Sequence, residues 1–181
     1  MKKMNKKALF LDRDGVINID FGYVYSIDNF VFVEGIFQFA ERAIQNNLEI
    51  FVITNQSGIG RGYYTESDFL HLSTWMRKKF DENQAPIKYI YHCPHYFPMS
   101  HSLGEQACEC RKPKPGLILK AAEEHSIDLA QSTLVGDKES DLEAGYRAGV
   151  GTLIYIGASS CNLATHSFRS IRDLVESEYE F

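Results

Sequence analysis

The sequence predicts an α/β fold in which a parallel sheet carries helices on both faces. Three observations support it. Short apolar runs of strand length alternate with longer segments of helical period. Polar and charged residues directly follow several of these apolar runs. The chain has 181 residues, enough for one sizeable core, so we expect a single domain over residues 1–181.

Five apolar runs are predicted to be strands of the sheet. Each is short and bounded by polar residues or turn formers, as buried strands are. They comprise residues 7–11, 49–53, 88–91, 133–135 and 152–156. Because strands alternate with helices along the chain, we expect the strands to run parallel.

Five further segments are predicted to be helices, namely residues 36–46, 65–84, 116–125, 140–148 and 171–177. The second of them has a start signal, since Thr65 is followed three residues later by Asp68, as in a capping box. Residues 14–33 and 93–110 fit neither period. Loops of this length in a compact domain are usually functional, so both are candidate parts of a site.

Composition and charge limit the kinds of partner that the protein can bind. Hydrophobic residues make up 44% of the chain and charged residues 24%, as in ordinary globular proteins. A formal net charge of -5 argues against nucleic acid or an anionic membrane surface as the main partner. No apolar stretch has the length of a membrane span, and the run after the basic start is too short for a signal peptide. We expect a cytoplasmic monomer with reduced cysteines.

Candidate site residues follow the predicted strands. Asp12 and Asp14 come after the first strand, Thr54 after the second and Asp137 after the fourth, while Lys112 lies between the third and the fourth. Ligands of open α/β sheets bind beyond the carboxyl ends of the strands. We therefore expect these side chains to meet at one edge of the sheet.

Phosphoryl transfer is the chemistry that this residue set favours. Several aspartates cannot be ionised side by side without a cation, and Mg²⁺ prefers oxygen ligands and bridges to phosphate. Asp12 is then placed to attack phosphorus and form an aspartyl-phosphate. Asp14 can protonate the leaving alkoxide and later deprotonate the attacking water. Thr54 and Lys112 can hold the equatorial phosphate oxygens.

Taken singly, the same segments have ordinary explanations. Asp-x-Asp-Gly is a common turn sequence, and a lone lysine is usually a solvated charge. Only the joint placement after strands favours an active site. The glycine-rich residues 58–62 match no nucleotide-binding fingerprint, and they are interpreted either as a mobile substrate loop or as an ordinary turn.

Three of the four cysteines lie in one eighteen-residue segment together with histidines. We expect a structural Zn²⁺ site there, because three sulfurs and one imidazole form a complete tetrahedral set. Its expected ligands are Cys93, His95, Cys108 and Cys110, with His92 and His101 as rival ligands. Metal binding would order the segment directly before Arg111 and Lys112, and we expect zinc to fix the backbone that presents these cations to substrate.

Four motifs of the chain resemble those of the haloacid dehalogenase superfamily of phosphohydrolases. They are residues 12–16, residues 53–55, Lys112 with Pro113, and Gly136-Asp137 with Asp141. Residues 54–62 and 93–113 further resemble the D-glycero-D-manno-heptose 1,7-bisphosphate phosphatase family. The resemblance extends from Ala8 to about Ile156, which is nearly the whole chain.

This resemblance implies a capless Rossmann-like domain with a zinc-binding loop insertion at residues 93–110. It also implies removal of the phosphate at carbon 7 of the heptose bisphosphate, a step toward nucleotide-activated heptose for bacterial surface polysaccharide such as lipopolysaccharide. By the same resemblance, magnesium is held by the side chains of Asp12 and Asp137 and the backbone carbonyl of Asp14. The implied substrate contacts are Arg111 and Lys112, with Asn55 beside Thr54.

Three other functions are weighed against this one. Histidinol-phosphate phosphatase shares the metal loop, but it typically has Asp in place of Ser57 and lacks the Arg61-Gly62 continuation found here. A non-catalytic zinc-binding interaction module would have no reason to retain all five of Asp12, Asp14, Thr54, Lys112 and Asp137. Phosphate removal from nucleic-acid ends is disfavoured by the acidic balance and the lack of a basic stripe.

Overall fold

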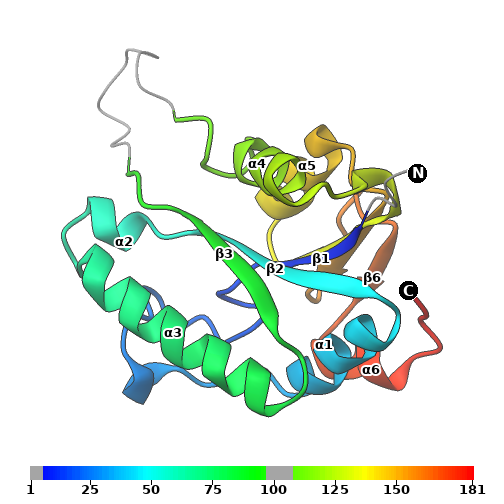
Figure 1. Cartoon of the computed structure of the whole chain (residues 1–181), viewed down its shortest axis with the longest axis horizontal. Helices are drawn as coiled ribbons and strands as arrows, with labels where there is room; N and C mark the ends of the chain where they lie inside the picture. Colours follow the sequence, from blue (N-terminus) through cyan, green and yellow to red (C-terminus); the bar gives the residue numbers. More distant parts are fainter. Residues whose placement is uncertain (1–5, 97–107) are drawn as a thin grey trace.

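A computed structural model of the chain describes residues 6–96 and 108–181, and it contains a six-stranded sheet between two layers of helices (Figure 1). All neighbouring strands are parallel, in the order β3-β2-β1-β4-β5-β6. Their bounds are β1 (Lys7–Leu11), β2 (Leu48–Asn55), β3 (Ile87–Cys93), β4 (Thr133–Gly136), β5 (Thr152–Ile156) and β6 (His166–Phe168). The five predicted strands are confirmed. The sequence missed β6, because this short, exposed edge strand has no apolar run.

The five predicted helices are also present, and one more helical turn lies beside the site. The helices are α1 (Ile36–Gln45), α2 (Ser57–Gly60), α3 (Glu66–Glu82), α4 (Gly116–His125), α5 (Glu139–Ala148) and α6 (Ile171–Glu176). Two 3-10 turns, η1 (Ile27–Asn29) and η2 (Leu129–Gln131), complete the set of described helical segments. The glycine-rich segment was predicted to be a loop or turn, whereas the structure folds its first part as α2, against the chain that follows β3.

Two apolar layers hold the sheet, one on each face. In β1, Leu9 and Leu11 belong to the layer that includes α1, α3 and α6, while Ala8 and Phe10 belong to the layer that includes α4 and α5 (Figure 1). Successive side chains of a strand point to opposite faces, so a central strand must be apolar at every position. This explains why residues 8–11 form one continuous apolar run.

The strand order places the site. The chain proceeds from β1 outward through β2 to β3, and then returns to the other side of β1 with β4. The gap between β1 and β4 is therefore the point at which the winding of the sheet reverses, where open α/β sheets bind ligands. Leu11 pairs with Val135 in this register, and the Asp12 amide donates to the Val135 carbonyl at 3.1 Å. Asp12 and Asp137 consequently leave neighbouring strands at the same edge.

The start of α3 confirms the predicted capping box. The Thr65 hydroxyl accepts a hydrogen bond from the Asp68 amide at 3.1 Å, and the Thr65 amide donates to the Asp68 carboxylate at 2.8 Å. These two bonds satisfy amide groups that a helix start otherwise leaves without partners. The box also fixes the chain immediately after Tyr64, a residue of the site.

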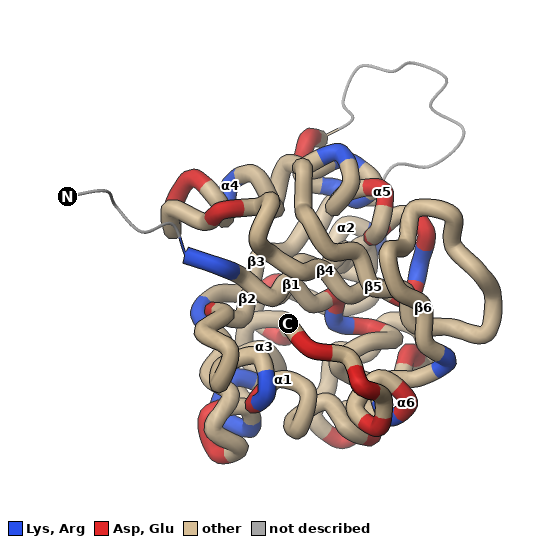
Figure 2. The backbone as a smooth tube through the Cα atoms, turned by 90° about the vertical axis from the view of Figure 1, so that its right-hand side faces the viewer, with Lys and Arg blue, Asp and Glu red and all other residues tan. Residues whose placement is uncertain are grey.

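Charged residues of both signs are interspersed along the chain, with acidic positions gathered in the C-terminal segment (Figure 2). The aromatic residues of this segment pack onto the domain, since the Phe39 and Phe181 ring centroids lie 5.1 Å apart. Within the two described ranges, no helix combines the length and the apolar character that a bilayer span requires.

Candidate active site

A cleft of about 450 Å³ lies at the carboxyl edge of the sheet. The structure brings most of the predicted site residues together there. Among the residues that line it are Asp12, Asp14, Thr54, Asn55, Arg111 and Lys112. These residues come from the ends of β1 and β2 and from the loop before α4. Their convergence follows from the parallel register, which brings the strand ends to one edge.

Three carboxylates form a compact group beside this cleft. Asp12, Asp137 and Asp141 each offer an oxygen, and these atoms all lie within 4.8 Å of one another. Asp137 Oδ1 is buried and has no hydrogen-bond partner among the described residues, which is costly unless a cation approaches it. An all-oxygen set with one unpartnered buried oxygen fits Mg²⁺. Asp141 belongs to the fourth motif, but the expected magnesium ligands did not include it.

Glycine is required at the contact between the first and fourth motifs. A Cβ atom on Gly15 would lie 2.2 Å from Asp137 Oδ2, and the backbone of Gly15 has φ +98°. Both the contact and the left-handed conformation exclude a larger residue. The turn after Asp14 thus lets the Asp137 carboxylate approach the backbone of the nucleophile loop.

Lys112 forms the cationic centre of the site. Its Nζ lies 2.7 Å from Asp12 Oδ1 and 2.7 Å from Asp141 Oδ1, and it donates to the Ile53 carbonyl at 2.8 Å. Burial works against the ammonium charge, but attraction to Asp12 and Asp141 outweighs it and raises the pKa of Lys112. Lys112 is therefore protonated at neutral pH.

For the acidic side chains of the site, burial favours the neutral form and therefore raises the pKa. It raises the pKa of Asp12 to about 7, against the attraction of Lys112. It also raises the pKa of Asp137 to about 6, against the attraction of Lys138. Both carboxylates are therefore easier to protonate than an exposed aspartate, and a further cation beside them would favour their ionised forms.

Asn55 and Arg111 were predicted to contact substrate, and the structure assigns each a protein partner as well. The Asn55 side chain donates to the Lys112 carbonyl at 3.2 Å and accepts from the Lys112 amide at 3.1 Å, so it clamps the Lys112 backbone to the end of β2. Arg111 Nη1 donates to the His95 carbonyl at 3.3 Å while its side chain lines the cleft. Their contacts with substrate stay predictions.

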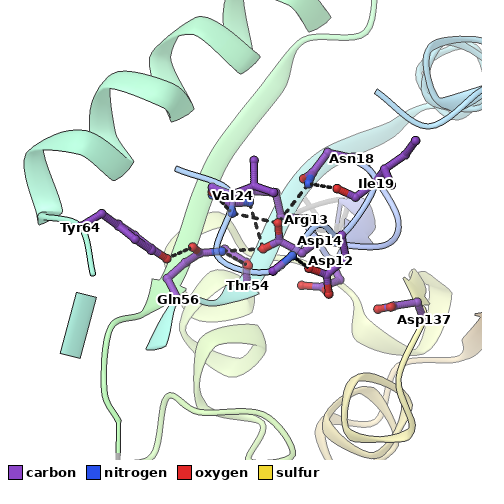
Figure 3. A network of polar contacts seen from close by, with 12 residues as sticks. Asp12, Arg13, Asp14, Asn18, Ile19, Val24, Thr54, Gln56, Tyr64 and Asp137 are labelled. Atoms are coloured by element: carbon purple, nitrogen blue, oxygen red, sulfur yellow. Dashed lines mark hydrogen bonds and ion pairs between the residues drawn. The ribbon is translucent and has the colours of Figure 1, made fainter. Parts of the chain in front are cut away.

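Asp14 is surrounded by hydrogen-bond donors (Figure 3). Its Oδ1 accepts from Arg13 Nη2 at 2.9 Å and from Asn18 Nδ2 at 3.1 Å. Its Oδ2 accepts from Arg13 Nε at 3.1 Å and from Gln56 Nε2 at 2.9 Å. Arg13 is 1% exposed and also donates to the Val24 carbonyl at 2.6 Å, so it ties the carboxylate to the irregular segment 14–33.

Sequence reasoning missed Arg13, Gln56 and Lys138. Gln56 has a weak signal, because it lies two residues after Thr54 and so on the same side of an extended chain. Arg13 sits between two assigned aspartates, yet charged residues are rarely buried, and nothing in the sequence marks this one as such. Lys138 lines the cleft, where its Nζ lies 3.1 Å from Asp20 and 3.6 Å from Asp137.

The predicted zinc ligands lie together at the end of β3 and before α4. Cys93 Sγ is 3.5 Å from Cys108 Sγ and 3.1 Å from Cys110 Sγ, and His95 Nδ1 is 3.2 Å from Cys110 Sγ. Thiolates bound tetrahedrally at about 2.3 Å from Zn²⁺ lie about 3.8 Å apart, so small shifts would admit the ion. The donor set therefore fits zinc, and one ligand, Cys93, belongs to β3 and not to the loop.

The rival histidines are placed differently. His92 Nε2 lies 2.6 Å from Glu66 Oε1, so its ring bonds to the start of α3 and not to the cysteines. His101 lies outside the described residues. The zinc segment also contacts α2, where the Gly60 amide donates to the Pro94 carbonyl at 2.9 Å.

A family model described as HAD-hydrolase-like matches residues 109–162, a span that contains the third and fourth motifs. Among full-length relatives, the D-glycero-alpha-D-manno-heptose-1,7-bisphosphate 7-phosphatase of Burkholderia mallei is 52% identical over 84% of this chain and 81% of its own length. The D-glycero-beta-D-manno-heptose-1,7-bisphosphate 7-phosphatase of Vibrio cholerae is 42% identical over 94% of this chain and 95% of its own length.

A solved structure agrees with these relatives. The D,D-heptose 1,7-bisphosphate phosphatase of B. bronchiseptica, crystallised with magnesium and phosphate, has a TM-score of 0.80 to this chain at 27% identity. The match covers 94% of this chain and 96% of that one. The two relatives by sequence and the relative by fold are thus all heptose bisphosphate phosphatases.

Proposed function

The chain belongs to the heptose-1,7-bisphosphate 7-phosphatase family of HAD-like hydrolases, and from this premise we propose that it removes the 7-phosphate of D-glycero-D-manno-heptose 1,7-bisphosphate through an aspartyl-phosphate. The observation that carries the proposal is the group of Asp12, Asp137 and Asp141 around Lys112 at the switch point of the sheet. Asp14 beside this group supplies the acid and base that hydrolysis needs.

In the first half of the reaction, an Asp12 carboxylate oxygen bonds to phosphorus while the bond from phosphorus to the sugar oxygen breaks. Asp14 gives its proton to that sugar oxygen, which leaves as an alcohol. Lys112 and the Thr54 hydroxyl hold the equatorial oxygens of the transferring group. When bound by Asp12, Asp137 and the Asp14 carbonyl, Mg²⁺ supplies the positive charge that lets a carboxylate approach a phosphate dianion.

In the second half, a water molecule attacks the phosphorus of the aspartyl-phosphate. Asp14, now a carboxylate, takes a proton from that water, and the bond from phosphorus to Asp12 breaks. Inorganic phosphate forms, and Asp12 and Asp14 return to their starting protonation states. The four hydrogen bonds that Asp14 accepts hold its carboxylate in place for this step.

The substrate carries a second phosphate, and cations at the rim of the cleft suit it. Arg111 and Lys138 line the cleft together with the deeper Lys112. Guanidinium and ammonium groups bind phosphate strongly, so the rim can hold the group that is not cleaved.

We further propose that Cys93, His95, Cys108 and Cys110 bind a structural Zn²⁺. The bond from Arg111 to the His95 carbonyl links the zinc ligands to a cation of the cleft, which supports the role expected for zinc. The cytoplasmic location, the monomeric state, the single domain over residues 1–181 and the contribution to lipopolysaccharide heptose stay predictions of this proposal.

A test of the zinc role is Cys108→Ser, with Cys161→Ser as the matched control outside the cluster. Loss of one thiolate should release zinc, loosen Arg111 and raise KM by about tenfold, the usual scale for one lost charge-assisted bond, while kcat changes less. Zinc content by metal analysis and steady-state kinetics measure both effects. Unchanged KM in a folded, zinc-free Cys108→Ser protein would contradict the role.

The proposed reaction is tested by phosphate release from a panel of sugar phosphates with Mg²⁺ present, including both heptose bisphosphate anomers and histidinol phosphate. The heptose bisphosphates should be the best substrates. Asp12→Asn keeps the shape of the nucleophile but removes its charge, so kcat should fall by about 10⁴-fold or more without loss of the fold. Activity retained in Asp12→Asn would contradict the assignment of the nucleophile.

A further inference from the structure

Gln56 is a buried side chain that contacts two catalytic groups at once, although the mechanism above does not use it. It is 2% exposed and follows the end of β2. Its Nε2 donates to Asp14 Oδ2 at 2.9 Å and to Thr54 Oγ1 at 2.8 Å (Figure 3). The Gln56 amide therefore bonds both to Asp14, the proposed acid and base, and to Thr54, which is proposed to hold an oxygen of the transferring phosphate.

Tyr64 and Asp14 together set which way this amide faces. The Tyr64 hydroxyl donates to Gln56 Oε1 at 2.5 Å, and the amide nitrogen faces the Asp14 carboxylate, which accepts and cannot donate. Burial raises the pKa of Tyr64 to about 12, so the hydroxyl retains the proton that it donates. The carbonyl of Gln56 thus faces Tyr64, and both amide hydrogens remain for Asp14 and Thr54.

The surrounding chain holds the Tyr64 ring in place. A Cβ atom on Gly58 would lie 2.1 Å from the ring, so only glycine in α2 permits this approach. On another side, Tyr25 stacks on Tyr64 with ring centroids 5.3 Å apart. Immediately after Tyr64, the capping box begins α3. The ring is therefore rigidly seated, as a group that orients another side chain must be.

The direction of the bond at Thr54 has a chemical consequence. Because Thr54 Oγ1 accepts from Gln56, its own hydrogen remains available to a different acceptor. Thr54 lines the cleft, where a phosphoryl oxygen would lie. The amide of Gln56 thereby sets the Thr54 hydroxyl as a donor toward the substrate.

We propose that Gln56 and Tyr64 are positioning residues for phosphoryl transfer. Tyr64 orients the Gln56 amide, and this amide orients Thr54 as a phosphate donor and holds Asp14 in place for proton transfer. The inference rests on the proposed function, because it takes Asp14 and Thr54 as reacting groups. Gln56 acts through those two groups, so its variants should affect the chemical step more than binding.

Two variants test whether Tyr64 acts through Gln56 on Asp14 and Thr54. Tyr64→Phe keeps the ring, its stacking and its contact with Gly58, but removes the hydroxyl. Gln56→Glu keeps the shape but replaces the amide donors with an acceptor, so the Thr54 hydrogen would turn toward the new carboxylate. Matched controls are Tyr146→Phe, whose side chain is 65% exposed on α5, and Gln38→Glu, an exposed position on α1.

The kinetic measurement compares two leaving groups through kcat/KM, which reports the steps up to formation of the aspartyl-phosphate. A sugar alkoxide must be protonated as it leaves, whereas p-nitrophenolate need not be. Tyr64→Phe and Gln56→Glu should lower kcat/KM for the sugar phosphate about tenfold more than for p-nitrophenyl phosphate, the scale of one lost buried hydrogen bond. Equal losses for both substrates would show that Gln56 does not position Asp14 for proton transfer, and no loss would show that it positions neither group; either result would overturn the proposal.

A second measurement does not depend on activity. In the wild-type protein, the Gln56 side-chain amide hydrogens should exchange slowly with solvent in nuclear magnetic resonance spectra, and in Tyr64→Phe they should exchange at least about tenfold faster. Equal exchange in the two proteins would also overturn the proposal. Failure of the proposed function would be visible separately, as no phosphate release from either heptose bisphosphate by the wild-type protein.

Discussion

At the scale of single residues, the site depends on how closely the first and fourth motifs approach each other. The Asp137 carboxylate lies against Gly15, where a side chain has no room. Asp137 Oδ1 has no partner within the described chain, and burial already raises the pKa of this group to about 6. Because Gly15 has no side chain, the Asp137 carboxylate can lie beside those of Asp12 and Asp141, where a cation would bind.

Gly15→Ala should displace Asp137 and weaken Mg²⁺ binding by more than about tenfold, because the added Cβ would lie 2.2 Å from the carboxylate. Titration calorimetry with Mg²⁺ measures the change. Gly22→Ala is the matched control in the same segment, since Gly22 also has a positive φ of +78° but no atom within 4 Å of the added Cβ. Gly22→Ala should cost about 1 kcal/mol of stability from backbone strain and leave the magnesium affinity unchanged. Equal magnesium affinities in the two variants would contradict this account.

At the scale of elements, contacts between neighbouring segments hold the described chain around the cleft. The turn α2 packs on the segment that carries the zinc ligands, through the bond from Gly60 to Pro94. Arg61 continues this contact, since its guanidinium lies 3.4 Å from the centroid of the Tyr96 ring and 5.9 Å from that of Tyr23. Tyr23 lines the cleft, so the cation that directly follows α2 connects the chain after β3 with the segment after Asp14.

The start of α3 is one such fixing point. Thr65→Ala should lower the free energy of unfolding by about 1 kcal/mol, because the Asp68 amide loses its side-chain acceptor. Chemical denaturation measures the change, and Thr74→Ala, at an exposed position within the same helix, should change stability less. Because the cap directly follows Tyr64, Thr65→Ala should also lower kcat modestly. A Thr65→Ala protein as stable as wild type would show that the capping box contributes nothing.

At the scale of the whole molecule, the buried acidic group couples stability to pH and to metal. In the folded, metal-free protein the pKa of Asp12 is raised to about 7 and that of Asp137 to about 6, above the ordinary value of 3.8. Between about pH 4 and pH 7 the folded protein therefore binds protons that the unfolded chain has released. The contribution of Asp12 and Asp137 to the free energy of unfolding is therefore greatest at low pH, and it falls as the pH rises through that window.

Magnesium should reverse this trend, because it binds the ionised carboxylates. At a Mg²⁺ concentration of about 100 times Kd, the gain is about 2.7 kcal/mol, or roughly 5–10 °C in Tm for a chain of this size. The increase in Tm should be larger near pH 7.5 than near pH 5, as measured by thermal unfolding with Mg²⁺ or with a chelator. Asp137→Asn should remove most of the difference. An equal increase at both pH values would contradict the coupling.

The amino-acid pattern alone is enough to predict the parallel α/β fold, five of the six described strands and the edge at which the site lies. Periodicity and the residues after each strand carry that information locally, and the family motifs sharpened it to named residues. Tertiary structure decided what depends on contacts across the chain: the edge strand β6, the inclusion of Asp141 in the acidic group, and the links from Gln56 to Asp14 and from Tyr64 to Gln56. The physical reason is that a side chain's partner is set by the packing of distant segments, whereas a strand is set largely by its own neighbours in sequence.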